Sequence, residues 1–348
     1  MDILAKITGI EYTPLFCRKL EAFDFEDLDR ALPRNATFIL NVDKENKVAV
    51  SWWVSAKRTR TYPYVRVYDS LGFAGKKITI IPVMKDEGKQ GDRDFLQWDT
   101  VSLMSLLDVY VIISYYKDAK SSARYTHKIT SQRFDTEQIK SEVKKLLSYH
   151  SSALHWNIEQ IGNVGIVGQK ALEAYVRISK KLGVDMHSDI SAQRRIAELL
   201  KSKEEFMALS RDLAEKAQAR ERQTTQPKEK LSGGKATITI WNYLGGCYYF
   251  TSDEAEIIGR DIYLVEGKHS KTNFLPSLVD IKDGLFKMIL FTNLEEVGVD
   301  NEPYNPVAVL KLTVEKGFNE KDISKTQKET ISILKQEAEL NGFQVIIE

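Results

Sequence analysis

The chain is poor in cysteine, because its 348 residues include two, Cys17 and Cys247. Two cysteines far apart in the sequence provide neither a disulfide framework nor the clustered ligands of a structural zinc site. The five histidines also lack the spacing of a metal site. Such sparse use of thiols is typical of a reducing compartment, so we expect a cytoplasmic protein.

Long hydrophobic runs are also missing. The longest apolar run, Val109–Ile113, is far shorter than the roughly 20 residues that a transmembrane helix needs. The first residues, Met1–Lys6, lack the basic start and the apolar core of a signal peptide. We therefore expect neither a membrane anchor nor secretion.

The chain has almost no net charge, because 50 lysines and arginines balance 49 aspartates and glutamates to +1. Any binding to nucleic acid must then rely on local basic clusters and not on a global field. Glycine-rich nucleotide-binding loops and the Gly-x-Ser-x-Gly pattern are absent from the sequence. Their absence argues against a nucleotide-driven motor and against a serine hydrolase.

The most informative segment is Asp261–Ser270, a short apolar strand that carries an acid and a lysine near its end. Side chains two apart in a strand point to the same side, so Glu266 and Lys268 should lie together on one face. A carboxylate beside an ammonium can bind a divalent metal ion and stabilise an oxyanion, as metal-assisted phosphodiester hydrolysis requires. The alternative interpretation is a solvated ion pair at a strand edge.

The elements around this segment follow a regular order. Gly259–Asp261 is typical of a tight hairpin turn, so the two strands that it joins should pair antiparallel and bring Glu256 near Glu266. Hydrophobic periodicity predicts three strands, a helix, a strand, a helix and a last strand. Their ranges are 235–244, 247–258, 261–270, 275–294, 306–314, 322–340 and 343–347.

This order, with acids on the second strand and Glu-x-Lys on the third, resembles the PD-(D/E)XK nuclease superfamily, and most of all the type II restriction endonucleases. Glu266 and Lys268 match the D/E and K positions of the family. Glu256 stands where the family has Asp, and the residue before it is alanine where the family has Pro. Glu254 and Asp261 are the alternatives for this first acid.

The resemblance covers the C-terminal part of the chain and implies the fold of a catalytic domain, whereas the N-terminal part matches no motif of the family and is expected to form a separate domain. The fold is α/β, with a mixed central sheet flanked by helices, an N-terminal α+β domain and a helical insertion. Residues 1–155 form the N-terminal domain, and residues 156–348 form the catalytic domain with an insertion at about 187–232. The family core includes a helix before its first strand, and 168–183 is the candidate, with Glu173 as its acid.

The function that the resemblance implies is Mg²⁺-dependent hydrolysis of double-stranded DNA at a specific sequence. Glu256, Glu266 and the carbonyl of Gly267 would bind Mg²⁺, while Lys268 orients or helps deprotonate the attacking water. Glu173 would position a second metal ion or Lys268. A homodimer and a cognate DNA methyltransferase are the expected partners. Two alternatives stay open: a structure-specific nuclease of DNA repair or recombination, and a non-catalytic DNA-binding protein on a nuclease fold.

Basic side chains in the N-terminal region form a candidate DNA-binding segment. Within 55–68, four cations alternate with tyrosines, a composition that suits phosphate contacts and stacking on bases. The alternative is an edge strand protected by charge, and 64–69 has the pattern of a strand. Residues just after the Glu-x-Lys strand could also donate to a DNA phosphate. The candidate DNA-binding residues are Lys57, Arg58, Arg60, Tyr62, Arg66, Ser270 and Lys271.

Two other segments of the chain are distinctive. The turn at Lys85–Asp99 is rich in acids, and both a second metal site and a loop held by local pairs of aspartate and arginine are open interpretations. Residues 189–222 have the spacing of a long charged helix, which would form the insertion.

Overall fold

The computed structural model describes residues 1–55, 62–188, 234–242, 244–271, 274–315 and 323–348, together with a few single positions between 190 and 197 and at 318. Most of the helix expected at 189–222 and most of the insertion expected at 187–232 lie outside the described residues. In the part of the chain that is described, no helix is long and apolar enough to cross a membrane.

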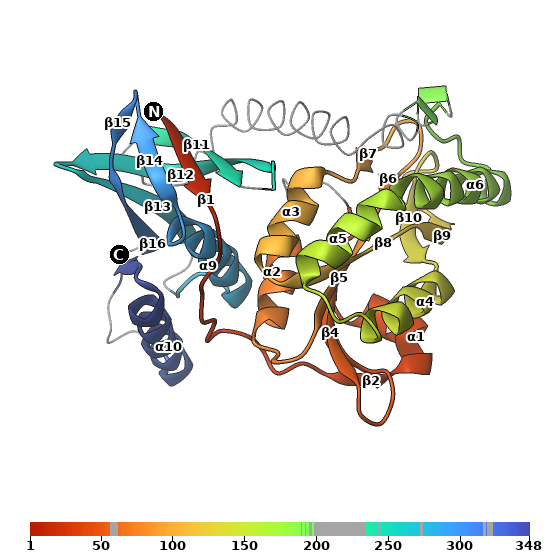
Figure 1. The fold of residues 1–348 in the computed structure, drawn as a ribbon, viewed down its shortest axis with the longest axis horizontal. Coiled ribbons are helices and arrows are strands. Elements are labelled where there is room, and N and C mark those ends of the chain that lie inside the picture. The colour runs from red at the N-terminus through yellow and green to blue at the C-terminus, as the bar shows by residue number, and fades with distance from the viewer. Residues whose placement is uncertain are drawn as a thin grey trace. The chain divides into compact units, whose positions relative to one another are not determined.

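The chain folds as two compact units. Unit 1 combines Met1–Arg18 with Arg211–Glu348, and unit 2 is Lys19–Ser210. This division differs from the boundary expected at residue 155 because β1 (Asp2–Ile7) pairs in parallel with β11 (Gly234–Asn242) along its whole length. The N-terminal strand, red in Figure 1, is therefore part of the same sheet as the C-terminal strands.

Unit 1 is built on a mixed sheet of eight strands. Besides β1 and β11 it contains β12 (Cys247–Ile258), β13 (Asp261–Ser270), β14 (Glu295–Val299), β15 (Glu302–Pro303), β16 (Asn305–Val314) and β17 (Gln344–Ile347). The spatial order is β15-β14-β1-β11-β12-β13-β16-β17. β11, β12 and β13 form an antiparallel meander, and β16 and β17 continue in parallel with β13. The expectation of an α/β fold with a mixed sheet is confirmed.

The sheet of unit 1 curls back on itself. Tyr304 alone separates β15 from β16, and its backbone N–H donates to the carbonyl of Val297 in β14 at 2.9 Å. β14 therefore pairs with β1 on one side and, on the other, with the chain segment that leads into β16. One row of alternating side chains, which includes Ile3 and Ile238, is fully buried, whereas Leu4 on the other face of β1 is 56% exposed.

Among the described residues, two helices complete unit 1. α9 (Leu278–Phe291) begins after Ser277, whose side chain caps the first turn, and it packs on β13 and β16. α10 (Lys325–Asn341) begins with a capping box at Ser324 and ends at Gly342, whose φ of 71° needs a residue without a side chain. The helix expected at 275–294 and the helix expected at 322–340 are both confirmed.

Unit 2 has a mixed five-stranded sheet of its own. Its strands are β2 (Ala22–Asp24), β3 (Thr37–Asn41), β4 (Lys47–Trp52), β5 (Lys77–Pro82) and β8 (Val109–Ser114), in the spatial order β2-β3-β4-β5-β8. β4, β5 and β8 are parallel, and α2 (Tyr62–Leu71) and α3 (Trp98–Leu106) lie between them in the sequence. The unit also contains η1 (Phe25–Asp27), α1 (Leu28–Arg34), β6 (Met84–Asp86), β7 (Arg93–Phe95), β9 (Tyr116–Ser121), β10 (Ile129–Phe134), α4 (Thr136–Leu147), α5 (Ala153–Gly162) and α6 (Val164–Leu182). Because α5 packs on β8 and α6 on β9, both helices belong to unit 2 (Figure 1).

The segment expected as a strand at 64–69 is part of helix α2. Tyr64, Val65, Val67 and Tyr68 are all buried, and this spacing puts them on one face of a helix. The strand prediction was wrong because it relied on the alternation of tyrosine and arginine and overlooked the valines beside each tyrosine.

Candidate active site

The turn between β12 and β13 decides which acids face each other. Gly259, with φ of 65°, begins a two-residue turn, and the pairing register runs from there without a shift. Even-numbered residues of β12 therefore pair with odd-numbered residues of β13. Glu256 pairs with Tyr263, is exposed and lies on the opposite face of the sheet from Glu266. The prediction that Glu256 lies near Glu266 was wrong because it did not take this register into account.

Asp253 is the acid of β12 that lies beside the Glu266 segment. The pairing of β12 with β13 ends at Glu254 and Val265, and Asp253 follows at a register shift in β12. The backbone N–H of Gly267 donates to Asp253 Oδ2 at 2.8 Å, and the charges of Asp253 and Glu266 both act on Lys287. Sequence reasoning missed Asp253, because the irregularity in β12 that places its side chain cannot be read from the length of the turn.

The two alternatives for the first acid lie elsewhere. Glu254 is buried on the face of the sheet opposite to Glu266. Asp261 is at the start of β13, far along the strand from Glu266, and accepts a hydrogen bond from Asn305 Nδ2 at 3.1 Å. Neither side chain is placed to act together with Glu266.

Glu266 and Lys268 lie side by side, as strand alternation predicts. Lys268 Nζ is 2.7 Å from Glu266 Oε1. The pair is not a solvated one at a strand edge, because Glu266 is 2% exposed and β13 lies between β12 and β16. Burial of charged groups is costly unless each of them has several partners.

Helix α9 provides further partners. Lys287 Nζ donates to Glu266 Oε2 at 2.6 Å and to the carbonyl of Thr251 at 3.0 Å. Asp283 Oδ2 accepts from Lys268 Nζ at 2.6 Å. Asp283 and Lys287 are four residues apart, so they lie on the same face of α9 and reach the same strand. We refer to the following five residues as the acid–lysine cluster: Asp253, Glu266, Lys268, Asp283 and Lys287.

Gly284 allows α9 to approach the sheet closely at this cluster. A Cβ atom on Gly284 would lie 2.6 Å from Leu310 Cδ1 and 3.4 Å from Lys268 Cε. A larger residue would therefore separate the helix from β16. The close approach is what brings the two α9 side chains within hydrogen-bond distance of β13.

The electrostatics of the cluster keep Lys268 charged. Burial would lower the pKa of Lys268, but the carboxylates of Glu266 and Asp283 outweigh it and hold that pKa above its usual value. Burial would raise the pKa of Glu266, but Lys287 and Lys268 outweigh it and lower that pKa. The pKa of Asp283 is raised by burial in spite of Lys268. Lys268 is therefore suited to stabilise negative charge and not to accept a proton at neutral pH.

The cluster contains the oxygen donors that a Mg²⁺ site needs. Asp253 and Glu266 place two carboxylates on neighbouring strands, and Mg²⁺ usually takes one or two carboxylates and completes its shell with water. Each oxygen of Glu266 binds one ammonium, which leaves a second lone pair on each oxygen for another ligand. Among the described residues, no group of three or more His, Cys, Asp or Glu side chains is arranged to hold a metal. The residues thus fit a site with two carboxylates completed by water.

Glu173 belongs to the other unit. It is an exposed residue of α6 and accepts a hydrogen bond from Gln169 Nε2 at 3.3 Å. Because α6 packs on β9 in unit 2, it is not a helix of the unit that contains Glu266. This placement is contrary to the expectation that 168–183 is the helix that precedes the first strand of the catalytic core.

The candidate DNA-binding residues have different surroundings. Outside the described residues lie Lys57, Arg58 and Arg60. Tyr62 is the first residue of α2, Ser270 is the last residue of β13, and Lys271 follows it on the surface. Contacts between these residues and DNA stay predictions.

Arg66 has a structural role in unit 2. Its Nη1 donates to the carbonyl of Trp52 at 2.7 Å, and its guanidinium carbon lies 4.2 Å from the centroid of the Trp52 ring. These contacts join α2 to β4, so Arg66 stabilises the packing of the unit.

Two acids of the turn at 85–99 have partners. Lys85 Nζ lies 2.5 Å from Glu87 Oε1 within the turn, and Asp86 Oδ1 lies 2.8 Å from Nδ1 of His187, which is distant in the sequence. The first contact is a local pair with lysine in place of the expected arginine, whereas the second is a long-range contact that the sequence did not indicate.

Comparisons with known proteins add no relative of established function. No family model matches the chain, and no curated protein matches it. A chain among the solved structures, titled "Adenylation, ketoreductase, and pseudo Asub multidomain structure of a keto acid-selecting NRPS module", aligns at 12% identity with a TM-score of 0.14. The alignment covers 99% of this chain and 25% of that one, so this chain spans about a quarter of its length. A TM-score this low carries no argument about fold or function.

Proposed function

We propose that this protein is a Mg²⁺-dependent endonuclease that cuts double-stranded DNA and acts as a type II restriction enzyme. The proposal is carried by the buried pair of Glu266 and Lys268, with Lys268 Nζ 2.7 Å from Glu266 Oε1, and by Asp253, whose carboxylate binds the N–H of the next residue, Gly267. This is the set of two acids and a lysine that the PD-(D/E)XK resemblance requires, with Asp253 in the place first given to Glu256. A homodimer and a cognate DNA methyltransferase would be its partners.

Each residue of the cluster has a role in this reaction. Asp253 and Glu266 would hold the metal ion, with Gly267 fixing the first carboxylate and Lys287 the second. Bound Mg²⁺ would lower the pKa of a coordinated water and offset the charge of the phosphate. Because its pKa is raised, Lys268 would act as a cation that orients the attacking water and stabilises the charge that develops on the phosphate.

The buried charges support a catalytic protein over a non-catalytic one on the same fold. Glu266 is 2% exposed and Asp283 is 7% exposed. Buried ion pairs are expensive to desolvate, and well-packed apolar residues in their place are often neutral or stabilising. A protein that needed only the fold would have little use for this arrangement.

Digestion of phage DNA and of methylated genomic DNA tests the proposal. We expect cutting with Mg²⁺, no cutting with EDTA, and binding without cutting with Ca²⁺, because the donors are hard oxygen ligands. Discrete fragments would support restriction. A smear, or cutting limited to unusual DNA structures, would support a repair or recombination nuclease. Full activity in EDTA would contradict the proposal.

Two variants on β12 make this test specific to the site. Asp253→Asn should abolish most cleavage, because it removes a charged metal ligand. Glu256→Gln makes the same change of charge three residues away, on the opposite face, and should cut like the wild type. Lys268→Ala should cut about 10²–10⁴-fold more slowly and still bind DNA. If Asp253→Asn and Glu256→Gln cut equally well, the active site lies elsewhere.

A further inference from the structure

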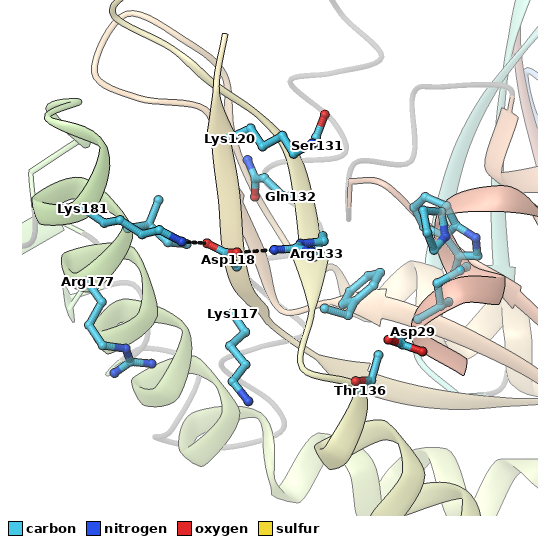
Figure 2. Close-up of a pocket in the computed structure, with 15 residues that line it drawn as sticks. Asp29, Lys117, Asp118, Lys120, Ser131, Gln132, Arg133, Thr136, Arg177 and Lys181 are labelled. Atoms are coloured by element: carbon cyan, nitrogen blue, oxygen red, sulfur yellow. Dashed lines mark hydrogen bonds and ion pairs between the residues drawn. The ribbon is translucent and has the colours of Figure 1, made fainter. Parts of the chain in front are cut away.

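Unit 2 contains a pocket that is separate from the acid–lysine cluster. Its volume is about 960 Å³, within the range of sites for small molecules. The β9–β10 hairpin, the C-terminal half of α6, helix α1 and the end of β4 line it (Figure 2). All of these elements belong to unit 2, so the pocket exists within a single compact unit.

The polar wall of this pocket is positively charged. Five cations and two carboxylates line it: Lys117, Lys120, Arg133, Arg177, Lys181, Asp29 and Asp118. Asp118 is held between Lys181, at 2.9 Å, and Arg133 (Figure 2). Lys181 and then Arg133 lower the pKa of Asp118 to about 2, so this carboxylate is ionised and occupied by its two partners.

Two cations of the pocket, Arg177 and Lys117, have few direct partners among the described residues. Arg177 is exposed on α6 and makes no hydrogen bond or ion pair with the described residues. Figure 2 shows Arg177 and Lys117 extending into the space beside the β9–β10 hairpin. Lys117 Nζ lies 3.6 Å from Asp135 Oδ1, which is a longer distance than that of a hydrogen bond. Two cations that line one pocket and have few partners are suited to bind a phosphate group.

The apolar wall of the pocket presents a rigid aromatic ring. Trp52 is half-buried, its Nε1 donates to the carbonyl of Asn35 at 2.8 Å, and its ring meets Phe134 edge-on at 6.1 Å between centroids. Leu32 and Ile178 complete this wall. A ring fixed in this way offers a planar ligand apolar contact with little further loss of side-chain freedom.

We propose that this pocket binds a nucleotide, with its phosphate at Arg177 and Lys117 and its base against the wall that contains Trp52. The combination of an anionic group and a flat apolar group matches both walls of the pocket, whereas inorganic phosphate would use only one. The nucleotide is either a free molecule or one that is extruded from DNA, since both present the same groups.

Binding measured by calorimetry in EDTA, where no cleavage interferes, tests this proposal with five probes. Three of them are small molecules: a deoxynucleoside monophosphate, the deoxynucleoside without phosphate, and inorganic phosphate. The other two are a fully paired DNA duplex and a duplex of the same sequence with one bulged nucleotide. The nucleotide should bind more tightly than the nucleoside and phosphate. Preference for the free nucleotide or for the bulged duplex then identifies the source.

Two variants on the same helix separate the pocket from general electrostatics. Arg177→Ala should weaken nucleotide binding about ten- to hundredfold, the usual effect of one charge-assisted hydrogen bond. Lys180→Ala removes the same charge from an exposed residue of α6 that does not line the pocket, and it should bind like the wild type. Equal loss in both variants, equal binding of nucleotide and inorganic phosphate, or no binding of any probe would overturn the proposal. The readout is binding, so none of these outcomes depends on the nuclease activity.

Discussion

Asp253 on β12 accepts a hydrogen bond at 2.8 Å from the N–H of Gly267, the residue that follows Glu266 on β13. Carboxylates on neighbouring strands repel each other. Lys268, from the strand, and Lys287, from α9, compensate this repulsion, and the pKa of Lys287 is raised by Glu266 and Asp253 in spite of its burial. The two lysines therefore affect both the stability of unit 1 and its candidate active site.

Lys287→Met should destabilise the protein by about 3–5 kcal/mol at pH 7, because it leaves the buried Glu266 with one ammonium partner in place of two. The pKa of Glu266 is lowered in the folded protein, so its stabilising effect is present above the unfolded pKa and is lost as the pH falls. The difference between variant and wild type should therefore shrink below about pH 4. Urea unfolding at several pH values measures this difference. Lys335→Met, which removes an exposed lysine from α10, should change stability by less than about 0.5 kcal/mol.

Gly284→Ala should cost about 1–3 kcal/mol, since the new Cβ would lie 2.6 Å from Leu310 Cδ1. It should also slow DNA cleavage, because moving α9 away from β16 would shift Asp283 and Lys287 relative to Lys268 and Glu266. Gly162→Ala is the matched control, because a Cβ at this helical position meets no atom within 4 Å. Thermal unfolding and initial cleavage rates of both variants provide the comparison, and similar values for the two would contradict the close packing of α9.

Asp118→Asn should reduce the stability of unit 2 at neutral pH. The pKa of Asp118 is lowered to about 2, so its ion pairs with Lys181 and Arg133 stabilise the fold above the unfolded pKa and are lost as the pH falls toward 2. The variant should therefore lose part of the acid dependence of stability between about pH 4 and pH 2. Asp185 is exposed and has no side-chain ion pair among the described residues. The control variant Asp185→Asn should therefore keep the wild-type pH profile.

Arg66→Met should lower stability by about 1–3 kcal/mol, because it removes the hydrogen bond to the Trp52 carbonyl and the cation–π contact with its ring. DNA affinity and its salt dependence should not change. Arg60→Ala should leave stability unchanged and instead weaken binding to all DNA sequences, with a salt slope reduced by about one. Arg66→Met that weakened DNA binding at unchanged stability would show that Arg66 contacts DNA.

Local sequence patterns determined most elements of unit 1. Alternation with a period of two places Glu266 and Lys268 on one face of a strand wherever that strand is packed. The glycine of the turn, Gly259, similarly determines the pairing of β12 with β13 as far as Glu254 and Val265, which is enough to place Glu256 on the face opposite to Glu266. The error over Glu256 came from ignoring this register and not from missing information.

Only the tertiary structure decided which distant segments meet. β1 pairs with β11, although all of unit 2 lies between them in the sequence, and no local pattern in Asp2–Ile7 specifies that partner. For the same reason the acid of the helix at 168–183, Glu173, was assigned to the wrong unit. An amphipathic helix shows that it has an apolar face, but the sheet against which it packs depends on long-range contacts.

Asp283 and Lys287 of α9 also show which features the sequence predicts and which the tertiary structure decides. The spacing of Asp283 and Lys287 by four residues places them on one side of a helix from sequence alone. That this side faces Glu266 and Lys268 depends on how the helix packs on β13 and β16, and on the close approach that Gly284 permits. Because burial and charge pairing arise only after this packing, the raised pKa of Lys268 is a property of the folded protein and not of the sequence pattern.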